Sequence, residues 1–307
     1  DTVRMQAIVV FTKIASFFGQ TKKNFEVYKE QFLNDCKRLK KYADRARFLE
    51  VFKPNGDVAD DNEMLDFYTK IASDYLRGGD VSSAKKNLSI SGHHRFVARS
   101  KKDLLRRYSI IDAGIKMRDN DFENASLDYL QVAESLSGPK KSKILRRAVV
   151  AAVLMDPGQS RDQIFGEING IPEVHELPVY KIFIRLNQSQ IVSPAEIDEM
   201  WDELNQEGYL NKETVLRSIK KHNLGEISKM YSAISMDRIT TMTGAAEDEI
   251  LLYIRGLVRE NKMKVGVDQL HRMIYFEPME TESAIYDASI AAYTREIQEV
   301  VGIINEK

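Results

Sequence analysis

Residues 235–277 read SMDRITTMTGAAEDEILLYIRGLVRENKMKVGVDQLHRMIYFE, and the spacing of their apolar residues changes along the stretch. Ser235 is a good helix N-cap, and Ile234 and Ile239 are placed to close over it as a hydrophobic staple. Gly244 suits the left-handed residue that ends a helix. We therefore expect a short helix that begins at Ser235 and ends before Gly244.

The rest of this stretch predicts a second helix followed by a β-hairpin. The apolar residues of the helix recur with the spacing of one helical face, at Ile250, Ile254, Leu257 and Val258. After Asn261 the period falls to two: Met263, Val265 and Val267 alternate with lysine or glycine, and Ile274 and Phe276 flank Tyr275. Helix, helix and hairpin in this order are typical of a winged-helix module.

The chain before this module is predicted to be a stack of helical hairpins. Ala72, Asp80, Ala84 and Leu88 recur 41 positions later as Ala113, Asp121, Ala125 and Tyr129. Small residues let two antiparallel helices approach closely, and the polar stretches 77–80 and 118–121 make the turns. An earlier fragment, residues 12–16, matches residues 69–73 and then degenerates. We expect a mostly α fold that begins with a tetratricopeptide-like (TPR-like) helical-repeat array over residues 1–210.

Further helices are expected after the repeats. They are predicted at residues 144–155, 161–167, 177–186, 194–204 with Ser193 as N-cap, and 213–231 with apolar residues at Leu216, Ile219, Ile227 and Met230. Residues 205–212 read as a connection, and residues 211–278 form the second expected domain, a linking helix plus the winged-helix module. Residues 279–307 predict a coiled-coil-type C-terminal helix with apolar spacings of four and three, at Tyr286, Ile290, Tyr293, Ile297, Val300 and Ile304.

The composition limits the classes of function. The 307 residues carry a net charge of −1, which argues against binding nucleic acid or acidic membranes through bulk charge. No apolar run reaches the roughly 18 residues that span a bilayer. The single cysteine, Cys36, excludes an intrachain disulfide, and together with the missing signal peptide it predicts a reducing compartment.

Catalytic and metal-binding motifs are not found in the sequence. His93-His94 is the only histidine pair, and it lies in a basic stretch without an acid at metal-ligand spacing. The acidic runs 60–61 and 247–249 lack an adjacent base, and they read as solvated faces or helix starts. The sequence offers no Gly-rich phosphate loop and no nucleophile elbow. We therefore expect no catalytic residue, no metal and no cofactor.

The order of helical array, linking helix, winged helix and terminal helix resembles that of the PCI-domain proteins. The resemblance runs from about Glu63 onward and is weak at Asp156-Pro157 and over residues 168–213. It rests on short stretches of sequence: His222-Asn223-Leu224 and Ser228-Lys229-Met230-Tyr231 in the linking helix, Gly266-Val267-Asp268-Gln269 and Phe276-Glu277 in the hairpin, Glu63 to Asp80, and Gly158-Gln159 with Arg161.

This resemblance implies a non-catalytic scaffold subunit of the COP9 signalosome, a complex that removes a ubiquitin-like protein from cullins (deneddylation). The implied partners are other PCI-domain subunits, the metalloprotease subunit pair and a cullin–RING ligase, with no membrane and no nucleic acid, and the implied location is cytoplasm and nucleus. The metalloprotease subunits of such complexes carry a His-x-His motif, which this chain lacks. A scaffold subunit of the proteasome regulatory lid is the alternative within the family.

Three stretches are candidate partner interfaces. In the family the winged helices line up, and a hairpin edge can be extended by a partner's strand, which points to Val265, Val267, Asp268, Gln269 and Tyr275. In the family the terminal helices form a bundle, and a run of about 27 residues, or about 40 Å, is long for a small domain to cover. The third candidate is the connection, with Asn205, Tyr209 and Asn211.

A winged helix also admits a nucleic-acid-binding function, because its second helix can enter the major groove. Here that helix begins with Glu247, Asp248 and Glu249, and between residues 246 and 261 these and Glu260 oppose two arginines. Counterion release requires the opposite balance of charge. Nucleic-acid binding is thus the alternative of another class, which a duplex-binding measurement at physiological salt would test.

Overall fold

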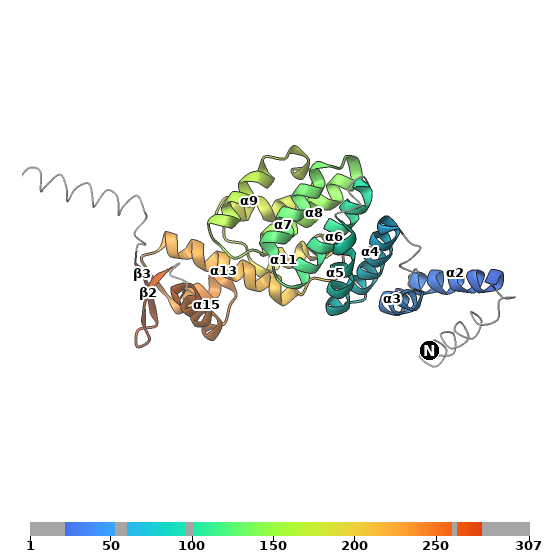
Figure 1. The fold of residues 1–307 in the computed structure, drawn as a ribbon. Helices are drawn as coiled ribbons and strands as arrows, with labels where there is room; N and C mark the ends of the chain where they lie inside the picture. The colour runs from blue at the N-terminus through green and yellow to red at the C-terminus, as the bar shows by residue number, and fades with distance from the viewer. Residues whose placement is uncertain (1–21, 53–59, 96–100, 260–262, 278–307) are drawn as a thin grey trace, which may run out of the picture. The chain divides into compact units, whose positions relative to one another are not determined.

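The computed structural model describes residues 22–52, 60–95, 101–259 and 263–277 (Figure 1). These residues are mainly helical, with one three-stranded sheet near residue 277. By packing they fall into two compact units, the first with residues up to 155 and 159–180, the second with 156–158 and residues from 181 onward. The domain boundaries expected after residues 210 and 278 stay predictions.

The first unit is an array of antiparallel helices. In chain order it contains α2 (Lys22–Arg38), α3 (Tyr42–Val51), α4 (Asp61–Arg77), α5 (Val81–Arg95), α6 (Lys102–Arg118), α7 (Phe122–Glu134), α8 (Gly138–Leu154), α9 (Gln159–Asn169) and the 3-10 turn η1 (Pro172–Val174). Neighbours in sequence pack side by side, α3 on α4, α4 on α5, α6 on α7 and α7 on α8 (Figure 1). The described part is therefore a helical-repeat array, as predicted.

The two predicted hairpin repeats are α4–α5 and α6–α7. All four of the small residues expected between the paired helices are fully buried: Ala72, Ala84, Ala113 and Ala125. Asp80 and Asp121 begin the second helix of each pair, where their carboxylates accept hydrogen bonds from the backbone N–H groups of Ser83 and Asn124. Both repeats therefore have the same close helix crossing and the same helix cap.

The turns within the repeats also match each other. Gly79 and Asn120 both have left-handed backbone angles, with φ of 85° and 63°. A Cβ atom on Gly78 would lie 2.7 Å from the backbone nitrogen of Ala43, so only glycine lets the start of α3 approach this turn. The earlier fragment, residues 12–16, lies outside the described residues.

The second unit contains the predicted winged helix. Its elements are α10 (Tyr180–Asn187), α11 (Pro194–Glu199), α12 (Trp201–Leu204), α13 (Lys212–Met230), β1 (Ala233–Ser235), α14 (Met236–Thr243), α15 (Glu247–Arg259), β2 (Lys264–Asp268) and β3 (Met273–Glu277). Ser235 caps α14 by accepting the N–H of Arg238, and Gly244 ends it with a φ of 64°. Ile234 and Ile239 lie in one core cluster with Ile250, Ile254 and Phe276. The cap and the stop are those predicted.

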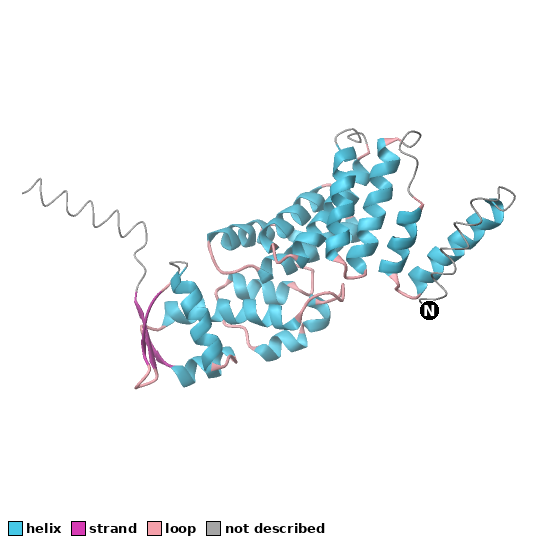
Figure 2. Cartoon of the chain, turned by 60° about the horizontal axis from the view of Figure 1, so that its bottom comes forward, coloured by secondary structure: helices cyan, strands magenta, loops and turns pink. Residues whose placement is uncertain are grey.

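The sheet has the strand order β1-β3-β2, with both pairs antiparallel. Tyr275 of β3 lies opposite Ala233 of β1 and Gly266 of β2. Figure 2 shows the strands with helices of the module against one side. The strand β1 was not predicted, because its last residue, Ser235, also begins α14.

Several details differ from the sequence expectations. The helix expected over 194–204 breaks at Met200 into α11 and α12, and the helix expected from residue 177 begins at Tyr180 after η1. His93 and His94 belong to the end of α5 instead of a connection. Val258 and Met230, expected on buried stripes, are 43% and 56% exposed.

The buried side of α13 is more polar than its apolar pattern suggests. Ile219 and Ile227 are buried as expected, but Ser218, His222, Asn223 and Glu226 are buried with them. The apolar stripe therefore continues toward the N-terminus through Val215 and not toward Met230. None of the described helices is both long and apolar enough to span a bilayer. The coiled-coil-type helix expected over residues 279–307 lies outside the described residues.

Candidate protein–protein interface

The strand β2 is an edge of the sheet in the described part of the chain, and its backbone has a free side. Phe276 donates its N–H to Ser232 O at 2.8 Å and Met236 donates to Arg272 O at 2.8 Å, so the even residues of β3 bond toward β1. Backbone groups alternate along an antiparallel strand, so the odd residues of β3 face β2. Since Tyr275 pairs with Gly266, the N–H and C=O groups of Val265 and Val267 point away from the sheet.

The side chains of β2 and β3 give the two faces of the sheet different characters. Ile274 and Phe276 are buried against the helices, and Val267 lies on the same face but is 40% exposed, because it stands at the free edge. Tyr275, which alternates with Ile274 and Phe276, is on the opposite face and is 45% exposed. Its cross-strand neighbours are only alanine and glycine, so the tyrosine ring stands above a flat surface.

The turn that joins β2 to β3 is braced by its own side chains. Asp268 accepts the backbone N–H groups of Leu270 and His271 at 2.9 and 3.1 Å, and its other oxygen lies 2.7 Å from His271 Nδ1. These hydrogen bonds lower the pKa of the Asp268 carboxyl, and the one with the imidazole of His271 has the largest effect. Gln269, also a predicted interface residue, is exposed between them. Asp268 therefore shapes the turn from within.

A second brace connects this turn to the starts of two helices. The Arg272 guanidinium lies 2.9 Å from an Asp237 oxygen and 2.8 Å from a Glu247 oxygen. Asp237 is in the first turn of α14, and Glu247 is in the first turn of α15. The sequence indicated only a solvated face or a helix start at Glu247, and its pairing across 25 residues with Arg272 carries no local sequence signal.

Side chains of the long helix α13 bind the segment that precedes α11. They thereby attach this segment to the winged helix. Asn223 is fully buried, and its side chain donates to Val192 O at 2.7 Å and accepts from Val192 N at 3.0 Å. His222 Nε2 donates to the carbonyl oxygen of Gln190 at 3.0 Å. These residues belong to the stretch that carried the family resemblance, and the structure gives that stretch a physical role.

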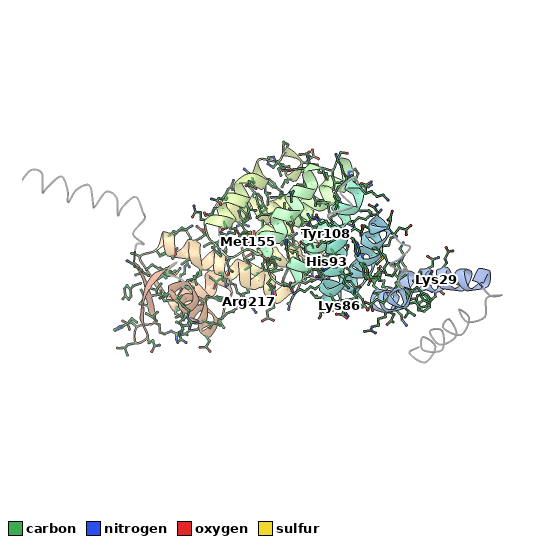
Figure 3. All side chains as sticks on the ribbon, viewed as in Figure 1. Lys29, Lys86, His93, Tyr108, Met155 and Arg217 are labelled. Atoms are coloured by element: carbon green, nitrogen blue, oxygen red, sulfur yellow. The ribbon has the colours of Figure 1, made fainter. Side chains whose placement is uncertain are left out.

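A groove of about 620 Å³ runs between α13 and α15 in the second unit. Arg217, labelled in Figure 3, lies on its α13 side, and Leu252, 64% exposed, lies on its α15 side. The charges in this region are paired with each other: Lys221 with Asp156 at 2.8 Å, and Lys220 with Glu249 at 2.7 Å. The Glu249 carboxylate also accepts the Tyr253 hydroxyl at 2.6 Å.

The predicted residues in the connection before α13 have local structural roles. Asn205 accepts the backbone N–H of Leu210 at 2.9 Å, and Asn211 is the N-cap of α13, where it accepts the N–H of Glu213. Tyr209 is half-buried between them. The structure therefore brings these three residues together, but with both asparagine side chains used inside the connection. The six predicted residues of the C-terminal helix lie outside the described residues.

Titratable side chains form pairs in the described part of the chain. His94 Nδ1 lies 2.6 Å from an oxygen of Asp61, a pairing that the sequence did not indicate. Among the residues that the structure describes, no group of three or more histidine, cysteine or acidic side chains is placed to hold a metal ion. The candidate site in the described part of the second unit is therefore the surface at the free edge of β2.

Comparison with known proteins identifies the class of this module. Residues 195–278 match the PCI domain. It is similar to COP9 signalosome complex subunit 4 of Arabidopsis thaliana, with 24% identity over 258 residues, 80% of this chain and 64% of that protein. The same-named proteins of Dictyostelium discoideum and Drosophila melanogaster are each 22% identical, over 78% and 70% of this chain. The chain spans 64%, 62% and 54% of the lengths of these three relatives.

Proposed function

We propose that this chain is a non-catalytic scaffold subunit of the COP9 signalosome. The observation that carries the proposal is a PCI domain that follows a helical array in the chain and whose sheet, among the described residues, has a free edge at β2. The shared name of the relatives supports the choice of complex. In this role the chain positions the deneddylase subunits and the cullin–RING ligase, and the isopeptidase reaction belongs to another subunit.

The geometry of β2 suits an assembly contact with another PCI-domain subunit. Val265 and Val267 each offer one outward N–H and one outward C=O, so an added strand would make up to four backbone hydrogen bonds. At about 0.5–1.5 kcal/mol net for each bond, this supplies roughly 2–6 kcal/mol. That is too little for a stable complex, so side chains such as Tyr275 and the residues of the C-terminal helix must contribute too.

A nucleic-acid-binding role fits this module less well. In a winged helix the start of the second helix and the hairpin turn are the parts that approach DNA. Here the start of α15 carries Glu247, Asp248 and Glu249, and Arg272 of the turn is held by carboxylates. Phosphate groups would meet negative charge there, which opposes binding.

Affinity capture from the native cells tests the proposal. The tagged chain is expressed in place of the natural one, and the captured proteins are identified by mass spectrometry. Imaging of the tagged chain in the same cells tests the expected location in cytoplasm and nucleus. We expect PCI-domain subunits, the metalloprotease pair and cullins, and we expect no cleavage of a cullin conjugate by the purified chain alone. Recovery of proteasome base subunits instead would favour the lid scaffold, and a chain that migrates as a monomer in extract would refute the proposal.

A further inference from the structure

The turn between β2 and β3 carries an apolar side chain that the fold does not use. Leu270 is 86% exposed, more than any other large hydrophobic residue in the described part of the chain. Leu252 follows at 64%. Leu270 lies outside the core cluster of the winged helix, so a polar residue would serve the turn equally well within this chain.

The turn holds Leu270 in one place on both sides. Before it, Asp268 accepts the N–H of Leu270 itself and that of His271. After it, Arg272 has a left-handed φ of 54°, which is strained for a residue with a side chain, and its guanidinium is fixed by Asp237 and Glu247. A side chain presented on a rigid turn loses little conformational freedom when it binds, which favours its use as an anchor.

The charges around the turn indicate what kind of surface it meets. In the network that braces the turn, the carboxylates of Asp237, Glu247 and Asp268 oppose one guanidinium, that of Arg272, and the imidazole of His271. Within this network the carboxylates outnumber the cationic groups. A complementary surface is an apolar pocket with lysine or arginine side chains at its rim.

We propose that Leu270 is the apolar anchor of the contact made by β2, and that it inserts into an apolar, basic-rimmed pocket on the neighbouring PCI-domain subunit. The contact is continuous, because Asp268 is both the last residue of β2 and the first brace of the turn. The inference rests on the proposed function. It adds a specific side chain to a strand edge whose backbone bonds alone carry little selectivity.

The test compares Leu270→Ser with Leu127→Ser, the same substitution at a 40% exposed leucine on α7. Each tagged full-length chain replaces the wild type in the native cells. Quantitative mass spectrometry then measures the amount of each PCI-domain subunit that is captured relative to the amount of the tagged chain. We expect Leu270→Ser to lose about tenfold or more of one neighbour, because the contact loses the burial of a whole leucine side chain. Leu270→Met should retain that neighbour within about twofold, and Leu127→Ser should behave as the wild type.

Three results would overturn the inference. Full recovery of every PCI-domain subunit by Leu270→Ser removes the anchor but leaves the proposed function intact. A wild-type chain that recovers no PCI-domain subunit refutes the proposed function as well. Self-association of the purified wild-type chain that Leu270→Ser abolishes, measured by light scattering, would show that a second copy is the occupant instead. Equal melting temperatures of the variants confirm that the turn still folds.

Discussion

Replacing Asn223 with alanine should strongly destabilise the winged-helix unit. The Asn223 side chain satisfies both backbone groups of Val192, and both residues are fully buried. The substitution leaves one N–H and one C=O without partners in a place that water does not reach. An unsatisfied buried polar group costs about 1–3 kcal/mol, so the two together cost roughly 2–6 kcal/mol. This is a large part of the 5–15 kcal/mol that stabilises a typical domain.

Trp201 makes this effect measurable, because it is the single tryptophan of the chain and lies on α12 in the second unit. Its fluorescence during urea unfolding follows that unit alone. With a urea slope of about 2 kcal/mol per molar, a loss of about 4 kcal/mol lowers the midpoint by about 2 M. Hydrogen exchange of the Val192 amide should accelerate in parallel, since this N–H loses its acceptor.

Gln269→Ala is the control, because it removes an amide side chain that is exposed on the wing turn. We expect it to change the unfolding free energy by less than about 0.5 kcal/mol. A loss below about 1 kcal/mol in Asn223→Ala, with Val192 still protected from exchange, would refute the reasoning. It would mean that α13 does not fix the segment before α11 through this side chain.

Three further predictions concern the same unit. Gly244→Ala should cost about 1–3 kcal/mol, seen as a lower Trp201-monitored midpoint, because its φ is 64° and the new Cβ would lie 2.7 Å from Pro194 Cγ. Burial alone would raise the pKa of the Glu249 carboxyl, but its lysine and tyrosine partners lower the pKa below its usual range, so ionised Glu249 stabilises the fold at neutral pH. The gap in melting temperature between wild type and Glu249→Gln should therefore narrow as the pH falls through the acidic range where this carboxyl takes up a proton, and a pH-independent gap would contradict this. Val267→Pro should keep the hairpin, since the N–H of Val267 points outward, and yet weaken capture of the neighbouring subunit. Gly266→Pro removes an N–H that faces β3, so it should disrupt the hairpin itself, as circular dichroism would show.

The elements with strong local signals could be predicted from the sequence. Ser235 and Gly244 mark the two ends of α14 because a cap and a left-handed stop are properties of a few adjacent residues. The helical repeats were visible because buried alanines and capping aspartates recur at a fixed interval. Tyr275 was correctly placed on the open face, since a period of two leaves no freedom once one face is buried.

Features that depend on residues distant in the chain could not be predicted. Asn223 looks like a surface residue in a helical pattern, and only Val192, 31 positions earlier, explains its burial. Val258 and Met230 fit the apolar spacing of their helices, so the pattern alone placed them in the core, although both are exposed. The burial of Tyr253 was not predicted, because it depends on Glu249, whose carboxylate accepts the tyrosine hydroxyl.

The strand order distinguishes the two edges of the sheet as sites for the proposed strand addition. A hairpin alone leaves two candidate edges, and the sequence could not choose between them. The strand β1 occupies one side of β3, and it is only three residues long because Ser235 already begins α14. An added strand beside β1 would find Ala233 followed by a helix, whereas β2 offers five residues without proline and ends at the braced turn. The described geometry therefore directs strand addition to β2, next to Leu270, and a mapped contact at β1 would contradict this assignment.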